Sequence, residues 1–210
     1  MVERGKYIVF EGNDGAGKST QVELLCDYLT KAGFELFKTK EPGGIPETMP
    51  IRDLILGPRG AEDPILQLIG FNFDRRVNLQ EVEKSLVEGK MVVQDRSFVG
   101  TRIYQSEHGI EMNDILYLEN LVLNMNNKWM DPDIIILIDV NPEVGMSRRV
   151  VGKEELNYFD KDKLEVQTKR REMYLKMAEE LEMEVVDGNK TEEEVFAKII
   201  KVLQKKGILS

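Results

Sequence analysis

The residues with the clearest chemical potential form a glycine-rich segment near the start of the chain. The segment reads Gly12-Asn13-Asp14-Gly15-Ala16-Gly17-Lys18-Ser19 and is followed by Thr20. It follows an apolar run at residues 7–10 and precedes a helical pattern, so it fits the phosphate-binding loop G-x-x-x-x-G-K-[ST] in its strand–loop–helix context. Glycines let backbone N–H groups approach phosphate oxygens, and the helix that follows adds the positive end of its dipole. A glycine-rich turn that binds nothing is the plain alternative.

Two side chains of this loop and one distant carboxylate predict a magnesium site. Lys18 is expected to reach the β- and γ-phosphates of a nucleotide, and the Ser19 hydroxyl is expected to face a magnesium ion. Asp95 ends a short apolar run and has the position of the second carboxylate that holds magnesium in phosphate-loop enzymes. The alternative for Asp95 and its neighbour Arg96 is an ordinary ion pair at the end of a strand.

Phosphoryl transfer requires charge neutralisation and alignment more than covalent participation by the protein. An acceptor phosphate therefore needs cations of its own, because two polyanions must approach within bonding distance. Arg96 and Arg52 are candidates, since the guanidinium fork binds phosphate through two hydrogen bonds. Arg148, Arg149 and Lys153 precede an acidic segment and predict a short mobile lid over about residues 148–160 that brings positive charge to the reaction. A short basic run can equally be a solvated face.

An aromatic ring and a cation share one face of a long predicted helix. Phe71 and Arg75 are four residues apart, which places them next to each other on the helix surface. The ring could stack on a nucleobase while the guanidinium bonds the edge of the base. The alternative is a core aromatic residue beside a surface salt bridge.

The elements that must position these residues alternate between strands and helices. Apolar runs predict strands at residues 6–11, 34–40, 91–94, 133–139 and 184–186. Helical periodicity predicts helices at residues 18–32, 49–56, 63–88, 113–126, 161–181 and 191–205, a further helix from Pro142, and a turn at residues 57–60. We therefore expect one α/β domain over residues 1–210, with a parallel five-stranded sheet of the P-loop NTPase type covered by helices on both faces.

This order of elements gathers the candidate residues at one edge of the sheet. Parallel sheets bind ligands at the carboxyl ends of their strands. The phosphate loop follows the first predicted strand, the loop at 41–46 follows the second, and Asp95-Arg96 follows the third. The three strand ends should share one crevice.

Composition limits the classes of partner. The formal net charge is −9, which argues against broad nucleic-acid binding, and we expect no such partner. No apolar run is long enough to span a membrane, and no apolar signal-peptide core follows Met1, so we expect no membrane association and a cytoplasmic location. A single cysteine and a single histidine exclude a Cys/His zinc cluster, and Cys26 is expected to be a buried structural thiol.

Taken together, these motifs resemble the thymidylate kinase family of nucleoside-monophosphate kinases, over nearly the whole chain. The matching segments occur in family order: Phe10 to Thr20, then Glu41-Pro42-Gly43-Gly44, then Phe71 to Arg75, and last Asp95-Arg96 with Tyr104-Gln105. The resemblance implies a magnesium-dependent transfer of the γ-phosphoryl group of ATP to dTMP, which gives dTDP and ADP. It also implies a homodimer formed through helices between about residues 63 and 126.

The resemblance further implies roles for individual residues. Phe71 would stack on thymine, Arg75 would read the base edge, and Tyr104 would pack under the sugar and disfavour a 2′-hydroxyl. Gln105 and Thr101 would lie near the pyrimidine. Arg96 would bind the acceptor phosphate, with Glu41 and Pro42 in the loop that surrounds it. Asp14 would lie near the 3′-hydroxyl, and Phe159 matches the aromatic residue just after the lid.

Some positions depart from the family pattern. Lys40 stands where an arginine is usual, Tyr158 replaces a frequent arginine, and Gly15 occupies the loop position that is basic in some members. The catalytic cation of the lid would then be Arg148, Arg149 or Lys153. Asn72 and Phe73 replace small residues and could reshape the acceptor pocket.

Other functions stay open at this point. The enzyme could act on another monophosphate such as dUMP, or on a free deoxynucleoside, although Arg96 and Arg52 favour an acceptor that already carries phosphate. A nucleotide-dependent switch ATPase would hydrolyse ATP without an acceptor, and it would leave Phe71, Arg75 and Tyr104 without a role.

Overall fold

The computed structural model describes residues 3–125, 128–152 and 164–209, with only the backbone described at 125, 128–129 and 149–152. The predicted lid residues Lys153, Tyr158 and Phe159 therefore lie outside the described residues, as does the side chain of Arg149.

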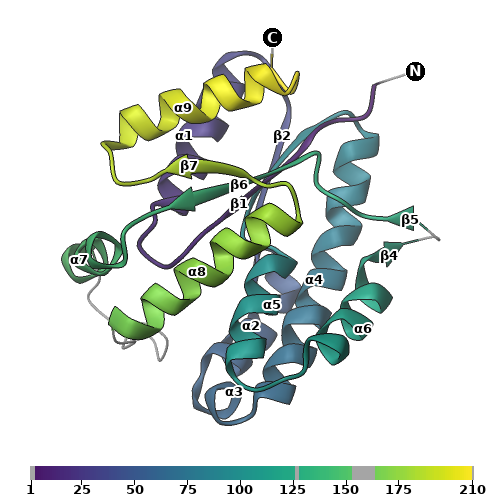
Figure 1. Ribbon diagram of the computed structural model, residues 1–210. Coiled ribbons are helices and arrows are strands. Elements are labelled where there is room, and N and C mark those ends of the chain that lie inside the picture. The colour runs from purple at the N-terminus through teal and green to yellow at the C-terminus, as the bar shows by residue number, and fades with distance from the viewer. Residues whose placement is uncertain (1–2, 126–127, 153–163, 210) are drawn as a thin grey trace.

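A five-stranded sheet with strand order β2-β3-β1-β6-β7 forms the centre of the molecule (Figure 1). Its strands are β1 (Tyr7–Glu11), β2 (Leu36–Lys40), β3 (Met91–Asp95), β6 (Ile134–Asp139) and β7 (Glu184–Asp187). All neighbouring strands run parallel, and the register pairs Asp95 with both Phe10 and Lys40. The predicted α/β fold with a parallel five-stranded sheet is confirmed. The ends of β1, β2 and β3 meet at one edge, as expected.

Helices cover both faces of this sheet. They are α1 (Lys18–Lys31), α2 (Met49–Leu56), α3 (Pro58–Glu62), α4 (Pro64–Val87), α5 (Phe98–Glu107), α6 (Met112–Leu123), α7 (Pro142–Gly152), α8 (Leu164–Glu180) and α9 (Glu192–Lys205). A short 3₁₀ turn, Pro46–Thr48, precedes α2, and the strands β4 (Asn124–Met125) and β5 (Lys128–Trp129) pair as a small antiparallel ribbon.

Alternation along β1 explains the two layers. Successive side chains of a strand point to opposite faces, so Ile8 and Phe10 pack with α1 and α9, whereas Tyr7 and Val9 pack with α4, α5 and α8. The two groups of helices lie on opposite sides of the sheet in Figure 1. Cys26 belongs to the first layer, and its burial raises the pKa of its thiol to about 11. That environment fits the predicted structural role.

Three local predictions were incomplete. The helix predicted at 113–126 ends at Leu123, and β4 follows it. The turn predicted at 57–60 contains the start of α3, because Pro58 is well suited to the first turn of a helix. Helix α5 was not predicted at all: Gly100 weakens the helical pattern, but Ser97 caps the helix and Phe98, Val99 and Ile103 anchor it in the core. None of the described helices is long and apolar enough to cross a membrane.

Candidate active site

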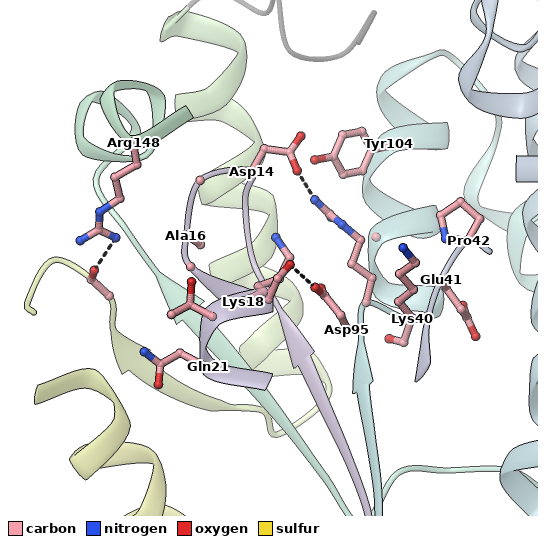
Figure 2. A pocket seen from close by; sticks show the side chains of 18 of the residues that line it. Asp14, Ala16, Lys18, Gln21, Lys40, Glu41, Pro42, Asp95, Tyr104 and Arg148 are labelled. Carbon is pink, nitrogen blue, oxygen red and sulfur yellow. Dashed lines mark hydrogen bonds and ion pairs between the residues drawn. The ribbon is translucent and has the colours of Figure 1, made fainter. Parts of the chain in front are cut away.

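A cavity of about 1220 Å³ opens at the carboxyl ends of β1, β2 and β3. Its lining brings together most of the residues predicted from the sequence. They come from the phosphate loop and the start of α1, the β2 and β3 ends, α2, α4, α5 and α7: Asp14 to Thr20, Glu41, Pro42, Arg52, Phe71, Arg75, Asp95, Arg96, Thr101, Tyr104, Gln105 and Arg148. Figure 2 shows this cavity with Lys18 near its centre. The predicted crevice at this edge of the sheet is confirmed.

The phosphate loop requires its glycines for steric reasons. Gly15 has φ +81°, and a Cβ atom there would lie 2.1 Å from the carbonyl oxygen of Gly145 in α7. A basic side chain at this position therefore does not fit the backbone observed here. The close approach of α7 to the loop is possible because residue 15 is a glycine.

Lys18 is buried beneath the loop that it closes. Its Nζ donates to the backbone oxygens of Gly12 and Asn13, at 2.9 Å each. Burial is the main cause that lowers the pKa of Lys18 to about 8, and the charge of Arg96 lowers it further. Burial therefore disfavours the charged ammonium group, and an anionic ligand bound next to it would favour the charged form again.

Ser19 and Asp95 form a small set of hard oxygen ligands. Ser19 Oγ donates to Asp95 Oδ2 at 2.6 Å, while Asp95 Oδ1 is buried and receives no hydrogen bond from the described residues. No group of three or more Asp, Glu, His or Cys side chains that could hold a metal occurs in the described part of the chain. Mg²⁺ usually takes only one or two carboxylates together with water and substrate phosphates. The residues present therefore fit magnesium.

Arg96 extends from the end of β3 toward the phosphate loop. Its backbone has φ +70°, a left-handed conformation that is uncommon outside glycine. Its guanidinium pairs with Asp14 of the loop and lies 3.5 Å from the hydroxyl oxygen of Tyr174 in α8. Glu11 fixes the next residue, because its Oε1 accepts bonds from both the backbone N–H and the hydroxyl of Ser97. These two bonds hold the backbone on the C-terminal side of Arg96.

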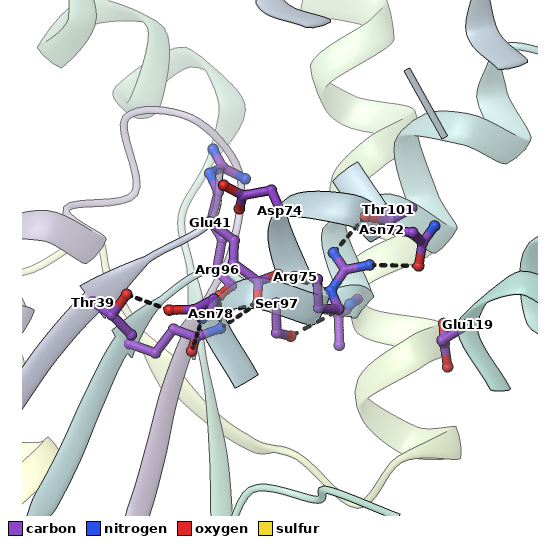
Figure 3. Close-up of polar contacts among 12 residues, drawn as sticks. Thr39, Glu41, Asn72, Asp74, Arg75, Asn78, Arg96, Ser97, Thr101 and Glu119 are labelled. Atoms are coloured by element: carbon purple, nitrogen blue, oxygen red, sulfur yellow. Dashed lines mark hydrogen bonds and ion pairs between the residues drawn. The ribbon is translucent and has the colours of Figure 1, made fainter. Parts of the chain in front are cut away.

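A buried polar network surrounds Arg75, which lines the cavity from α4 (Figure 3). Arg75 Nε donates to Glu41 at 2.8 Å, one terminal nitrogen donates to Thr101 at 2.8 Å, and the other donates to Asn72 at 3.2 Å. Asn78 and Gln94 donate to the second oxygen of Glu41 and continue the network into the sheet. Arg75 is therefore locked in one orientation before any ligand binds.

Two further α5 residues line the same end of the cavity. Gln105 is fully buried; its amide nitrogen donates to Gln67 at 3.3 Å, while its Oε1 has no hydrogen-bond partner among the described residues. The Tyr104 ring lies close to two guanidinium groups, since the central carbons of Arg96 and Arg170 are 5.9 and 4.3 Å from its centroid. Phe71 lines the cavity from α4. For a flat ring in the cavity, Phe71 offers a stacking surface, Arg75 a hydrogen-bond donor and Gln105 Oε1 an acceptor.

The remaining predicted cations occupy different places. Arg52 lines the cavity and donates to the carbonyl oxygen of Pro42 at 2.5 Å. Arg148 donates to the carbonyl oxygens of Gly188 and Lys190, and Figure 2 places it on the other side of Lys18 from Tyr104. In this structure Arg148 thus contacts the loop between β7 and α9 rather than the Arg96 side of the cavity.

Sequence reasoning missed several residues that support the site. Glu11, Tyr174 and Gln94 are buried polar residues that hold Arg96 and Glu41 in place. A glutamate at the end of the apolar run 7–10 and a glutamine within the run 91–94 were signals for such roles, because polar side chains inside buried strands need partners. Tyr174 carried no such signal within its charged helix.

Comparison with known proteins gives a consistent match. A family model described as thymidylate kinase matches residues 10–199. A thymidylate kinase of Carboxydothermus hydrogenoformans is 36% identical over 197 residues, which cover 93% of this chain and 95% of the relative. One from Bartonella henselae is 33% identical and covers 93% of both chains, and one from Sulfurihydrogenibium sp. is 32% identical and covers 98% of this chain and all of the relative. The chain belongs to the thymidylate kinase family.

Proposed function

We propose that this protein transfers the γ-phosphoryl group of ATP to dTMP in a magnesium-dependent reaction that gives dTDP and ADP. The observation that carries the proposal is a single cavity lined by the phosphate loop, by Arg96, which pairs with Asp14 of that loop, and by Arg75, which is fixed by Glu41. Family membership and the names of the relatives support the same reaction. Because ATP and nucleoside monophosphates are intracellular metabolites, we also propose a cytoplasmic location.

On the donor side, the loop from Gly12 to Thr20 would hold the triphosphate. Lys18 would move from the carbonyl oxygens of Gly12 and Asn13 to the β- and γ-phosphates. Ser19 and Asp95 would hold Mg²⁺, which neutralises charge on the phosphates when it is bound. Lid cations would complete the charge neutralisation, and Arg148 and Arg149 are our candidates for that role, together with Lys153.

ATP binding is expected to take up protons at alkaline pH. In the free protein Lys18 titrates near pH 8, and a bound triphosphate favours its charged form, so at about pH 9 binding should bring close to one proton to Lys18. At about pH 7 Lys18 is already protonated and should take up none. Calorimetry in buffers of different ionisation enthalpy measures this uptake, and Lys18→Met should abolish it. Equal uptake at both pH values would contradict the proposed position of Lys18.

On the acceptor side, Arg96 and Arg52 would bind the phosphate of dTMP, with Pro42 and Glu41 in the loop that surrounds it. Asp14, which pairs with Arg96 in this structure, would exchange that contact for the 3′-hydroxyl of the sugar. No general base is required, because the acceptor phosphate already carries a nucleophilic oxygen. Closure of the site would exclude water that otherwise hydrolyses ATP.

Hydrogen-bond complementarity favours thymine or uracil over cytosine. Arg75 can only donate, which suits the O4 carbonyl of thymine, and the unpartnered Gln105 Oε1 can accept from the N3–H group. Cytosine presents a donor at position 4 and an acceptor at position 3, so both bonds would be lost. Phe71 would stack on the ring, and Thr101, which accepts from Arg75, would keep that arginine in place.

Release of ADP in the presence of different acceptors tests the proposal. We expect strong turnover with dTMP, weaker turnover with dUMP, and little with UMP, dCMP, AMP or thymidine. Strong turnover with another monophosphate would favour the alternative kinase. Release that is unchanged when no acceptor is added would overturn the proposal in favour of a switch ATPase.

We also propose that the protein is a homodimer that pairs through α4 and α6. Among the described residues, Ile65, Ile69 and Phe73 repeat every four positions on α4 and are 55, 54 and 54% exposed. Tyr117 and Leu121 on α6 are 69 and 59% exposed, and the two helices pack against each other. Apolar side chains that gather on adjacent helices are a common mark of an interface. A second copy of this chain would cover them.

Replacing Ile69 by aspartate is expected to convert the dimer into a monomer, because the new carboxylate would be buried without a partner. Light scattering coupled to size-exclusion chromatography should give about twice the chain mass of 24.1 kDa for the natural protein and about 24.1 kDa for the variant. Val185→Asp, on the edge strand β7, is the control and should leave the dimer intact. A monomeric natural protein at micromolar concentration would contradict the proposal.

A further inference from the structure

Arg170 is a buried cation that has no part in the proposed reaction. It lies on α8 with 2% of its surface exposed, and its Nε donates to Glu107 Oε2 at 2.6 Å. Its guanidinium carbon lies 4.3 Å from the centroid of the Tyr104 ring. Burying a charge away from water is costly unless it is paired, so an arginine at this place needs both the carboxylate and the ring.

The contacts of Arg170 restrict how Tyr104 can move. Tyr104 and Glu107 are three residues apart on α5 and therefore share one face of that helix. Arg170 contacts both, so the carboxylate fixes the guanidinium and the guanidinium in turn supports the ring. A planar guanidinium can lie over an aromatic face while its Nε bonds a carboxylate, which an ammonium group does not reproduce. The orientation of Tyr104 thus depends on a residue from another helix.

Helix α8 is itself firmly attached to the site. The side-chain nitrogen of Asn13 in the phosphate loop donates to the carbonyl oxygen of Gln167 at 2.9 Å. Tyr174 of the same helix is buried in one core cluster with Ile103 of α5. A support that is anchored in this way can hold Tyr104 against displacement by a ligand.

We propose that Arg170 is a positioning residue that sets the selectivity for 2′-deoxynucleotides by holding the Tyr104 ring in place. The inference rests on the proposed function, in which Tyr104 lies under the sugar of the acceptor. A ring excludes a 2′-hydroxyl only if it cannot yield to the additional oxygen. Without Arg170 the ring gains room to tilt, and the ribonucleotide gains access.

The test compares dTMP with ribothymidine 5′-monophosphate, which differ only in the 2′-hydroxyl. The readout is the value of kcat/KM for dTMP divided by the value of kcat/KM for the ribonucleotide. In the double variant Arg170→Leu with Glu107→Gln, which leaves no unpaired carboxylate, the ratio should fall about tenfold, mainly through a lower KM for the ribonucleotide. Arg170→Lys should give an intermediate ratio, because it keeps the charge but not the planar stack.

Arg171→Leu is the matched control. Arg171 is next to Arg170 on the same helix, and its Nε donates to Asp139 at 2.6 Å, the same distance as in the Arg170–Glu107 pair. Its loss should lower the melting temperature while the ratio stays within about twofold. If the double variant does not fold, the single variants Arg170→Lys and Glu107→Gln provide the test. Each should lower the ratio while the protein stays folded.

Three outcomes separate a failure of the inference from a failure of the function on which it rests. A natural protein that prefers dTMP strongly, together with Arg170 variants that keep the ratio within about twofold, would overturn the role of Arg170 alone. A natural protein that turns over both acceptors equally would overturn the placement of Tyr104 under the sugar, and the inference with it. A natural protein without turnover of either acceptor would overturn the proposed function itself.

Discussion

Arg96→Met is expected to lower kcat/KM for dTMP by about 10³-fold, or roughly 4 kcal/mol of transition-state stabilisation. Arg96 lines the cavity, its guanidinium pairs with Asp14 of the phosphate loop, and in the proposed reaction it binds the acceptor phosphate. Its loss would leave two polyanions close together with less charge to neutralise them. Steady-state kinetics with dTMP as the varied substrate measures the effect, and the KM for ATP should change by less than about threefold.

Arg96→Lys is the matched variant for this prediction. It keeps the positive charge but loses the fork that can bind phosphate through two bonds, so we expect it to recover about one or two of the three lost orders of magnitude. A kcat/KM for Arg96→Met within about tenfold of the natural protein would show that Arg96 does not bind the acceptor phosphate. A similarly large rise in the KM for ATP would instead indicate that Arg96 binds the donor nucleotide.

Arg75→Met is expected to destabilise the protein by about 3–5 kcal/mol, because it leaves the Glu41 carboxylate buried without its cation. The side chains of Arg75 and Glu41 are only 2 and 4% exposed, so water cannot replace the lost partner. For a chain of 210 residues this corresponds to a melting temperature lower by roughly 10 °C. Thermal unfolding at about pH 8 measures the difference, and the double variant with Glu41→Gln should recover at least half of it.

The effect of Arg75→Met should also depend on pH. Burial is the main cause that raises the pKa of Glu41, and the charge of Arg75 counteracts it. Without Arg75 the pKa rises further, so the folded state binds a proton more readily than the unfolded state and gains stability as the pH falls. The difference in melting temperature should therefore narrow between about pH 8 and pH 5.5. A constant difference, or one below about 3 °C at pH 8, would contradict a buried ion pair at this place.

Local sequence patterns were sufficient to predict most of the framework of the site. The apolar run before Gly12 and the helical pattern after Lys18 placed the phosphate loop between β1 and α1, where the structure has it. The short apolar run that ends on Asp95 predicted β3, and the parallel arrangement that followed brought Asp95 close to Ser19. Such patterns are reliable because a buried strand must be apolar on both faces and a phosphate loop needs glycine at fixed positions.

Features that depend on tertiary packing could not be predicted in this way. Helix α5 has a weak local pattern, and it forms because Phe98, Val99 and Ile103 are buried against the sheet and Ser97 meets Glu11. The contact of Arg170 with Tyr104 joins residues 66 positions apart and has no periodic signature. The same limit applies to the nucleotide-binding end of the cavity. Phe71 and Arg75 were predicted as neighbours on a helix, but Glu41 and Thr101, which accept hydrogen bonds from Arg75, come from other elements.

The most direct test of the central claim follows the phosphoryl group itself. With ATP that carries radioactive phosphorus in its γ position, magnesium and dTMP, we expect the label to appear in dTDP, with less than about a tenth released as inorganic phosphate. Lys18→Met should abolish the transfer. Label that appears only as inorganic phosphate, at the same rate with and without dTMP, would contradict the account, because the cavity would then activate water rather than align an acceptor.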